Sequence, residues 1–115
     1  MRTIKGRVIF KATTGKSIQP NAVLTVSVQD CSLQDAPSVT LGQRVIKEID
    51  SFPIEFECQF DDKVIEEKSY GTYTISATIR SADDKLLYLN DTSHPIVDSS
   101  SGKILDTIDV EVIKI

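Results

Sequence analysis

Acidic side chains are the residues of this chain whose type and position could do chemistry. Asp30 and Asp35 lie close together after an alternating segment, and Asp91 lies much further along the chain. Such carboxylates could bind a sugar or another small ligand, or supply the acid and base of a weak hydrolase. That chemistry also uses aromatic platforms, and the chain contains no Trp and only three Tyr. We keep this acidic corner as the alternative hypothesis for function.

The same carboxylates, with Asp83 and Asp84, are candidate ligands for Ca²⁺, but their spacing argues against a metal site. An EF-hand loop needs a central glycine and a closing glutamate, and neither stands at the required position. Aspartates at strand ends usually accept hydrogen bonds from nearby backbone N–H groups and shape turns. We therefore expect no metal site and interpret this segment as a structural corner, which a proline rigidifies. The residues of the corner are Asp30, Ser32, Asp35 and Pro37.

Two further patterns resemble catalytic motifs and are incomplete. The segment 14–17 reads Thr-Gly-Lys-Ser, but Phe10 stands where a P-loop needs its first glycine, and no helix pattern follows. His94 is the only histidine, and no serine lies in a Gly-x-Ser-x-Gly motif. We expect no catalytic residues and no cofactor, so the sequence indicates a protein that is not an enzyme.

The elements that must position these residues are β-strands, because apolar and polar residues alternate along most of the chain. Turn signals rich in Gly, Pro, Asp and Ser separate the alternating segments. About seven short strands with regular turns are typical of an antiparallel β-sandwich. We therefore predict an all-β fold and one sandwich domain over residues 1–115. The expected strands cover residues 4–10, 22–29, 39–49, 54–60, 73–80, 85–89 and 108–112.

Composition limits the partners and the compartment. The 115 residues carry a net charge of -4 with acids and bases interspersed, so we expect no nucleic-acid partner. No apolar run approaches the roughly 20 residues that span a bilayer, and no signal peptide is visible. The protein is then cytoplasmic if Met1 is native, or a mature domain whose leader has been removed. Cys31 and Cys58 are expected as free thiols, with a disulfide as the alternative.

One segment is apolar on both faces and is our candidate for partner binding. It is either a strand beneath a covering loop, or a strand with one side exposed for a partner. A protein or peptide partner could add a strand to the sheet edge or lay a helix in an apolar groove. The candidate residues are Leu86, Leu87, Tyr88 and Leu89.

The ordered set of segments resembles the YscW/YbaY-type family of small lipoproteins, which includes type III secretion pilotins and uncharacterised relatives. The resemblance covers nearly the whole chain, and its most specific segment is Gln29–Pro37. The other segments that carry it are Gly6 with Val8, Pro20–Val26, Pro53–Phe56, Tyr73–Ile79, Lys85–Thr92 and Pro95–Val97.

This resemblance implies a β-sandwich without a catalytic site. It also implies a protein partner, since pilotins bind the C-terminal segment of an outer-membrane secretin and help it reach the membrane. Family members are anchored at the outer membrane by a lipidated N-terminal cysteine. The present sequence has no cysteine near its start, so no lipobox marks such an anchor.

Overall fold

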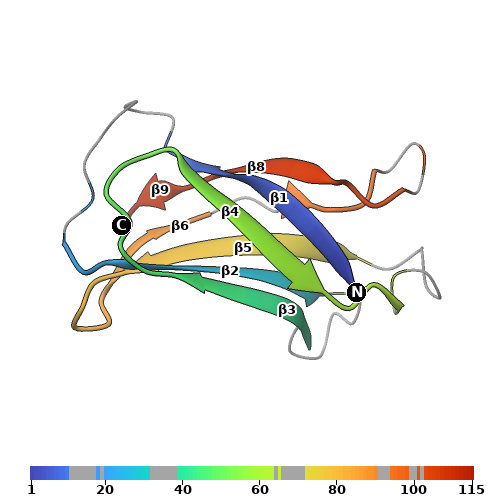
Figure 1. The fold of residues 1–115 in the computed structure, drawn as a ribbon, viewed down its shortest axis with the longest axis horizontal. Helices are drawn as coiled ribbons and strands as arrows, with labels where there is room; N and C mark the ends of the chain where they lie inside the picture. The colour runs from blue at the N-terminus through green and yellow to red at the C-terminus, as the bar shows by residue number, and fades with distance from the viewer. Residues whose placement is uncertain are drawn as a thin grey trace.

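The computed structural model shows a protein built almost entirely of β-strands (Figure 1). It describes residues 1–10, 18, 20–31, 39–63, 65, 72–90, 94–98, 101 and 103–115. The strands are β1 (Arg2–Ile9), β2 (Val23–Asp30), β3 (Val39–Ile46), β4 (Ile54–Phe60), β5 (Tyr73–Arg80), β6 (Leu86–Leu89), β7 (His94–Pro95), β8 (Thr107–Glu111) and β9 (Ile113–Lys114).

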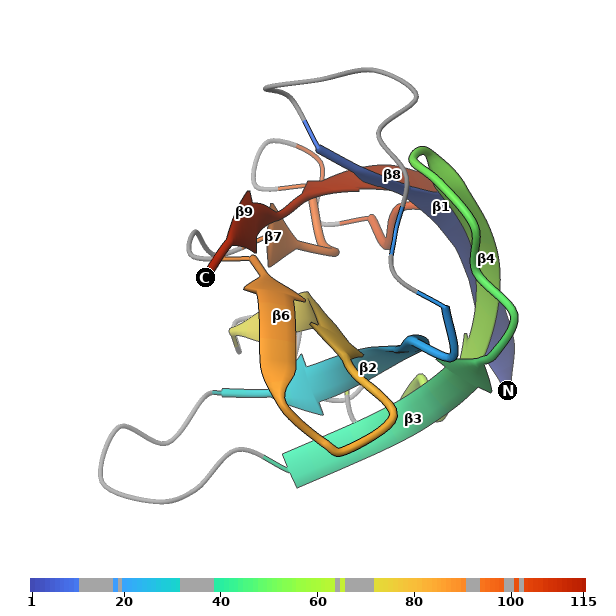
Figure 2. The same ribbon diagram turned by 90° about the vertical axis from the view of Figure 1, so that its left-hand side faces the viewer.

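The strands form two sheets that pack face to face (Figure 2). Within the described residues, the smaller sheet has the order β4-β1-β8. The larger sheet has the order β3-β2-β5-β6-β9, and β7 also pairs with β5. The predicted all-β sandwich is confirmed. The sequence did not predict that β1 and β8 pair in parallel, or that β7 and β9 form short strands.

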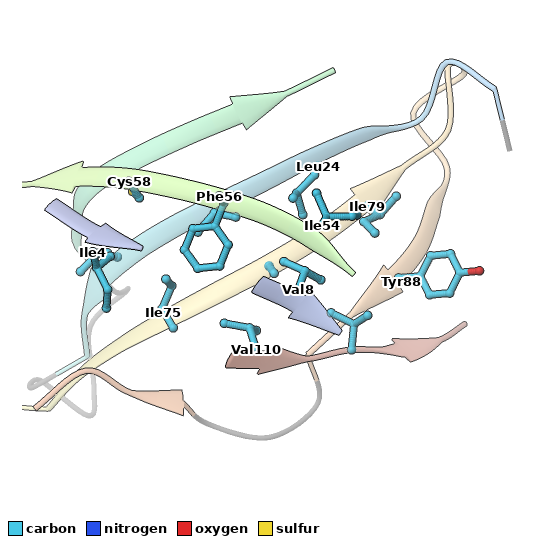
Figure 3. Close-up of a cluster of buried hydrophobic side chains, with 14 of the residues drawn as sticks. Ile4, Val8, Leu24, Ile54, Phe56, Cys58, Ile75, Ile79, Tyr88 and Val110 are labelled. Atoms are coloured by element: carbon cyan, nitrogen blue, oxygen red, sulfur yellow. The ribbon is translucent and has the colours of Figure 1, made fainter. Parts of the chain in front are cut away.

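Alternation places one side of each strand in a common core, because successive side chains of a strand point to opposite faces. In β4, Ile54, Phe56, Cys58 and Phe60 are buried, whereas the three residues between them are exposed. The buried side of β5 lies opposite, and Val8 and Val110 complete the centre of the cluster (Figure 3). In β4 and β5 the sequence pattern therefore sets which face is buried, whereas in β3 the apolar residues Val39 and Val45 are exposed.

The chain passes from one sheet to the other at Val112, which lies between β8 and β9. The backbone N–H of Val112 donates to the carbonyl oxygen of Ile9 in the smaller sheet. The N–H of Ile115 donates to the carbonyl oxygen of Leu87 in the larger sheet. The two sheets are therefore joined along this side by continuous backbone.

On the opposite side, β3 and β4 approach each other at one point without pairing as strands. The N–H of Asp61 donates to the carbonyl oxygen of Leu41 at 3.1 Å. A Cβ atom at Gly42 would overlap the carbonyl oxygen of Gln59, so only glycine permits this approach. From this contact the two strands separate along their lengths, as Figure 1 shows.

Candidate functional site

The outer face of the smaller sheet is charged. Two cross-strand rows run over β4, β1 and β8: the first contains Glu55, Arg7 and Asp109, and the second contains Glu57 and Lys5 beside a threonine. Arg7 Nη2 lies 3.1 Å from Asp109 Oδ2, and both side chains are about half exposed. The hydrogen bond and charge of Asp109 raise the pKa of the Arg7 guanidinium. This face carries opposite charges that alternate from strand to strand.

The outer face of the larger sheet carries a row without charge across five strands. In this row each residue pairs with the next through the register of β3, β2, β5, β6 and β9. Beside the row, the hydroxyls of Ser27 and Ser76 are hydrogen-bonded at 2.8 Å. We call the row the uncharged row; its residues are Val45, Thr25, Thr78, Leu89 and Ile113.

The strand proposed for partner binding contributes to both the core and this outer face. Tyr88 is 5% exposed and packs against Phe10 and Phe52, with ring centroids 5.5 and 5.1 Å away. Leu86, Leu87 and Leu89 are all partly buried, and Leu87 packs against the core. Leu89 pairs with Ile113, which is 39% exposed. Tyr88 therefore anchors the strand, and partner binding by Leu86–Leu89 stays a prediction.

The acidic corner is only partly covered by the described residues. Asp30 ends β2, is partly buried, and lies opposite Tyr73 on the neighbouring strand. The other members of the corner, and the carboxylate of the alternative hypothesis, lie outside the described residues: Ser32, Asp35, Pro37 and Asp91. The described part of the chain contains no group of three or more His, Cys, Asp or Glu side chains placed to hold a metal ion. The structural corner and the alternative ligand site both stay predictions.

The side chain of the histidine links two strands, and the two cysteines are not bonded to each other. The Nε2 atom of His94 accepts a hydrogen bond from the backbone N–H of Glu111 at 3.4 Å, which links β7 to β8. Cys31 and Cys58 are free thiols, as expected. Burial raises the pKa of the Cys58 thiol, and the charge of Arg44 opposes this shift.

The sequence analysis missed a cavity of about 660 Å³ on the outer side of the smaller sheet. Its walls include Arg44 and Ile46 from β3 and Glu55 and Glu57 from β4. A smaller cavity of about 370 Å³ adjoins it and shares Arg44 and Glu57. The alternation of Val39, Leu41 and Val45 does not predict this cavity, because Arg44 faces the core side of the larger sheet only through its pairing with Val26.

These features define a β-sandwich whose charged rows and uncharged row lie on its outer surfaces. Such an arrangement is typical of a binding module. Residues 1–107 match the model of the family described as type III secretion system lipoprotein chaperone, YscW. The chain belongs to this family, and the resemblance found in the sequence is confirmed. No helix among the described residues is long and apolar enough to span a membrane.

Two similar proteins show how far the likeness extends. The chain is 33% identical over 88 residues to the uncharacterized lipoprotein YbaY of Escherichia coli K12, which is 76% of this chain and 45% of that protein. The chain therefore spans less than half the length of that relative. It is also similar to the solved structure of an alternative pilotin from the type II secretion system of Vibrio cholerae, at 27% identity with a TM-score of 0.81. That match covers 99% of this chain and 96% of the other.

Proposed function

We propose that this chain is a non-catalytic, pilotin-like module that holds a segment of a secretion-system protein. The family is described as one of lipoprotein chaperones, and a similar solved structure is described as a pilotin. The resemblance suggests the C-terminal segment of an outer-membrane secretin as the partner, with the complex on the outer-membrane side of the cell.

The uncharged row is the single observation that carries this proposal. Val45 and Ile113 are 47% and 39% exposed, and Leu89 lies between the two edges on the same face. Burial of apolar side chains at such positions favours a complex, and this gain is offset in part by the entropy lost on association. Threonines between them let a partner approach closely, without the desolvation of a charge.

The strand β6 is the centre of the proposed surface. Leu86, Leu87 and Leu89 supply apolar area, and Tyr88 holds the strand against the core through its aromatic contacts. Core packing of this kind keeps the outer side chains in fixed positions, which lowers the entropy lost on binding. In this proposal the sandwich of residues 1–115 acts as one rigid unit.

The test is the Leu89→Lys variant, measured by calorimetry against a synthetic peptide of the C-terminal segment of the secretin from the same organism. Because a charge must be desolvated at the centre of the surface, we expect affinity to fall about tenfold or more. Thr107→Lys is the matched control, since Thr107 is exposed on the charged face. Unchanged affinity in a folded Leu89→Lys variant, checked by circular dichroism, would show that this surface does not bind the peptide.

A further inference from the structure

The smaller sheet leaves part of β3 uncovered. Ile46 pairs with Leu24 and Arg44 pairs with Val26, so these β3 side chains share the core-facing side of the larger sheet. Leu24 and Val26 are fully buried, whereas Arg44 is exposed and Ile46 is partly buried. Since paired residues on one face differ so much in burial, the covering sheet must end before it reaches this part of β3.

The strand that ends the covering sheet is β4, and one of its edges is free over most of its length. The order β4-β1-β8 gives β4 a single strand partner. Between residues 43–46 of β3 and residues 55–59 of β4, the described structure has no strand pairing and no backbone hydrogen bond. We call this region the β4 ledge. The contact at Gly42 closes one end, and the chain from 47 to 53 bounds the other (Figure 1).

The β4 ledge has room for a short extended segment. The larger cavity, of about 660 Å³, begins at Arg44 and Ile46 of β3 and reaches over the outer face of β4, β1 and β8, so part of its volume lies along the ledge. The smaller cavity, of about 370 Å³, adjoins it at Arg44 and Glu57. Open space of this size, roughly 300–1,000 Å³, is usual for ligand sites. The edge from Glu55 to Gln59 spans about 13 Å, at a rise of roughly 3.3 Å per residue of a strand.

The charges of the smaller sheet specify what the next strand should carry. Glu55 lies beside Arg7, and Arg7 lies beside Asp109, so charge alternates along that row. Glu57 lies beside Lys5 in the second row. Two of the three outward-facing β4 residues along the free edge are therefore acidic, and the third is Gln59. Opposite charges in directly facing cross-strand pairs are stabilising, so a basic side chain fits on the outer face of an added strand.

The inner face of an added strand would meet different chemistry. It would lie over Ile46 and the aliphatic part of Arg44, both of which line the larger cavity with Phe56. Aliphatic side chains of the added strand fit this floor. The reason is that Arg44 can offer its apolar stem to them while it keeps its charged group in water. An added strand should therefore alternate between basic and aliphatic residues.

We propose that the free edge of β4 accepts an extended segment of a partner protein, alternating aliphatic residues with Lys or Arg, as a fourth strand of the smaller sheet. Main-chain hydrogen bonds to β4 hold the segment, and the alternate side chains select it. This site uses the edge of β4 and the core-facing side of β3, whereas the proposed pilotin surface is the outer face of the larger sheet, to which β3 contributes only Val45 on its opposite side. The two proposals therefore stand or fall separately.

The test uses a synthetic heptapeptide of alternating valine and lysine, titrated into the whole chain and followed by nuclear magnetic resonance. We expect shifts of the amide signals of Glu55–Gln59, and about tenfold slower hydrogen exchange at the amides of the β4 edge. A peptide alternating valine and glutamate should bind about tenfold more weakly, because it places like charges beside Glu55 and Glu57.

Two controls separate strand addition from simple attraction between a basic peptide and an acidic protein. A valine–lysine peptide with alternate backbone nitrogens methylated keeps its charge and loses main-chain donors, so its affinity should fall about tenfold. The Glu57→Lys variant should prefer the valine–glutamate peptide. Glu111→Lys, which makes the same charge change on β8, should keep the original preference.

The proposal is wrong if methylation leaves affinity unchanged, if Glu111→Lys acts as strongly as Glu57→Lys, or if the shifted amides lie on the larger sheet. Absence of binding at millimolar concentrations of the valine–lysine peptide also overturns it.

Discussion

The two outer faces of this sandwich are built from strands of the same kind and differ in charge. Over the smaller sheet, Glu55, Arg7 and Asp109 alternate in sign across three strands. Over the larger sheet, the uncharged row crosses five strands from Val45 to Ile113. Both sheets bury one side and expose the other. The charge of the exposed side can therefore differ between the sheets without affecting the core, and this difference can be used in binding.

The difference in charge indicates what kind of partner each face suits. Charges on a sheet discourage non-specific pairing of strands and favour partners of complementary charge. A surface without charge can be buried by a partner without the cost of desolvating ionised groups. The smaller sheet is therefore suited to select a partner by charge, and the larger sheet to hold one by apolar contact.

The largest expected effect tests the core that the two faces share. Phe60 is fully buried, so Phe60→Ala should lower the free energy of unfolding by about 3–5 kcal/mol. Gln59→Ala, on the exposed side of the same strand, should change it by less than about 0.5 kcal/mol. Urea unfolding followed by circular dichroism measures both. Equal losses in the two variants would mean that β4 does not divide a buried side from a solvated one.

A smaller effect tests the contact at which β3 meets β4. A Cβ atom at Gly42 overlaps the backbone of Gln59 and crowds Phe60, so Gly42→Ala should cost about 1–3 kcal/mol in the free energy of unfolding. Gln43→Ala, at the next and exposed position, is the control. If Gly42→Ala unfolds at the same urea concentration as the parent, the two sheets are not held together at this point.

The third prediction concerns the larger sheet, where hydroxyls replace charges. Ser27 is 9% exposed and its hydroxyl lies 2.8 Å from that of Ser76. A double-mutant cycle with Ser27→Ala and Ser76→Ala should give a coupling energy of about 0.5–1.5 kcal/mol. The coupling should be the same at low and high salt, since neither group is charged. A coupling that disappears in concentrated salt would contradict this description of the face.

The smallest effect is expected on the charged face and should respond to salt in the opposite way. Because Arg7 and Asp109 are solvent-exposed, Asp109→Asn should lower the urea midpoint only slightly, and only at low ionic strength. At 1 M salt the screening length falls to about 3 Å, and the difference should vanish. The measurement is urea unfolding of the parent and the variant, carried out in parallel at both salt concentrations. A salt-independent loss would indicate a packing role for Asp109.

The sequence predicted most of the strands because their signal is local. The bounds of β4 and β5 agree with the alternating segments at 54–60 and 73–80, where every second residue is apolar. The short strands β7 and β9 were missed, because two residues are too few to show a period. In β3 the expected strand runs on to residue 49, whereas the structure ends it at Ile46.

The candidate site was harder to predict because it depends on which strands become neighbours. Leu86–Leu89 was recognised as apolar on both faces, and the structure adds that Leu89 continues a row begun by Val45 on a distant strand. The β4 ledge has no motif, since Arg44 and Glu57 meet only through the folding of separate sheets. Such sites follow from non-local pairing, which the period of a sequence does not encode.

The sequence by itself determined that the chain is an all-β sandwich, because alternation and turn residues act over a few neighbouring positions. Its likeness to the YscW family rests instead on an ordered set of segments along the chain. Only the tertiary structure decided that β8 lies parallel to β1, that three covering strands leave Arg44 exposed and Ile46 partly buried, and that one outer face is charged while the other has an uncharged row. The physical reason is that strand order and sheet overlap are set by contacts between distant segments, whose energies depend on the whole core.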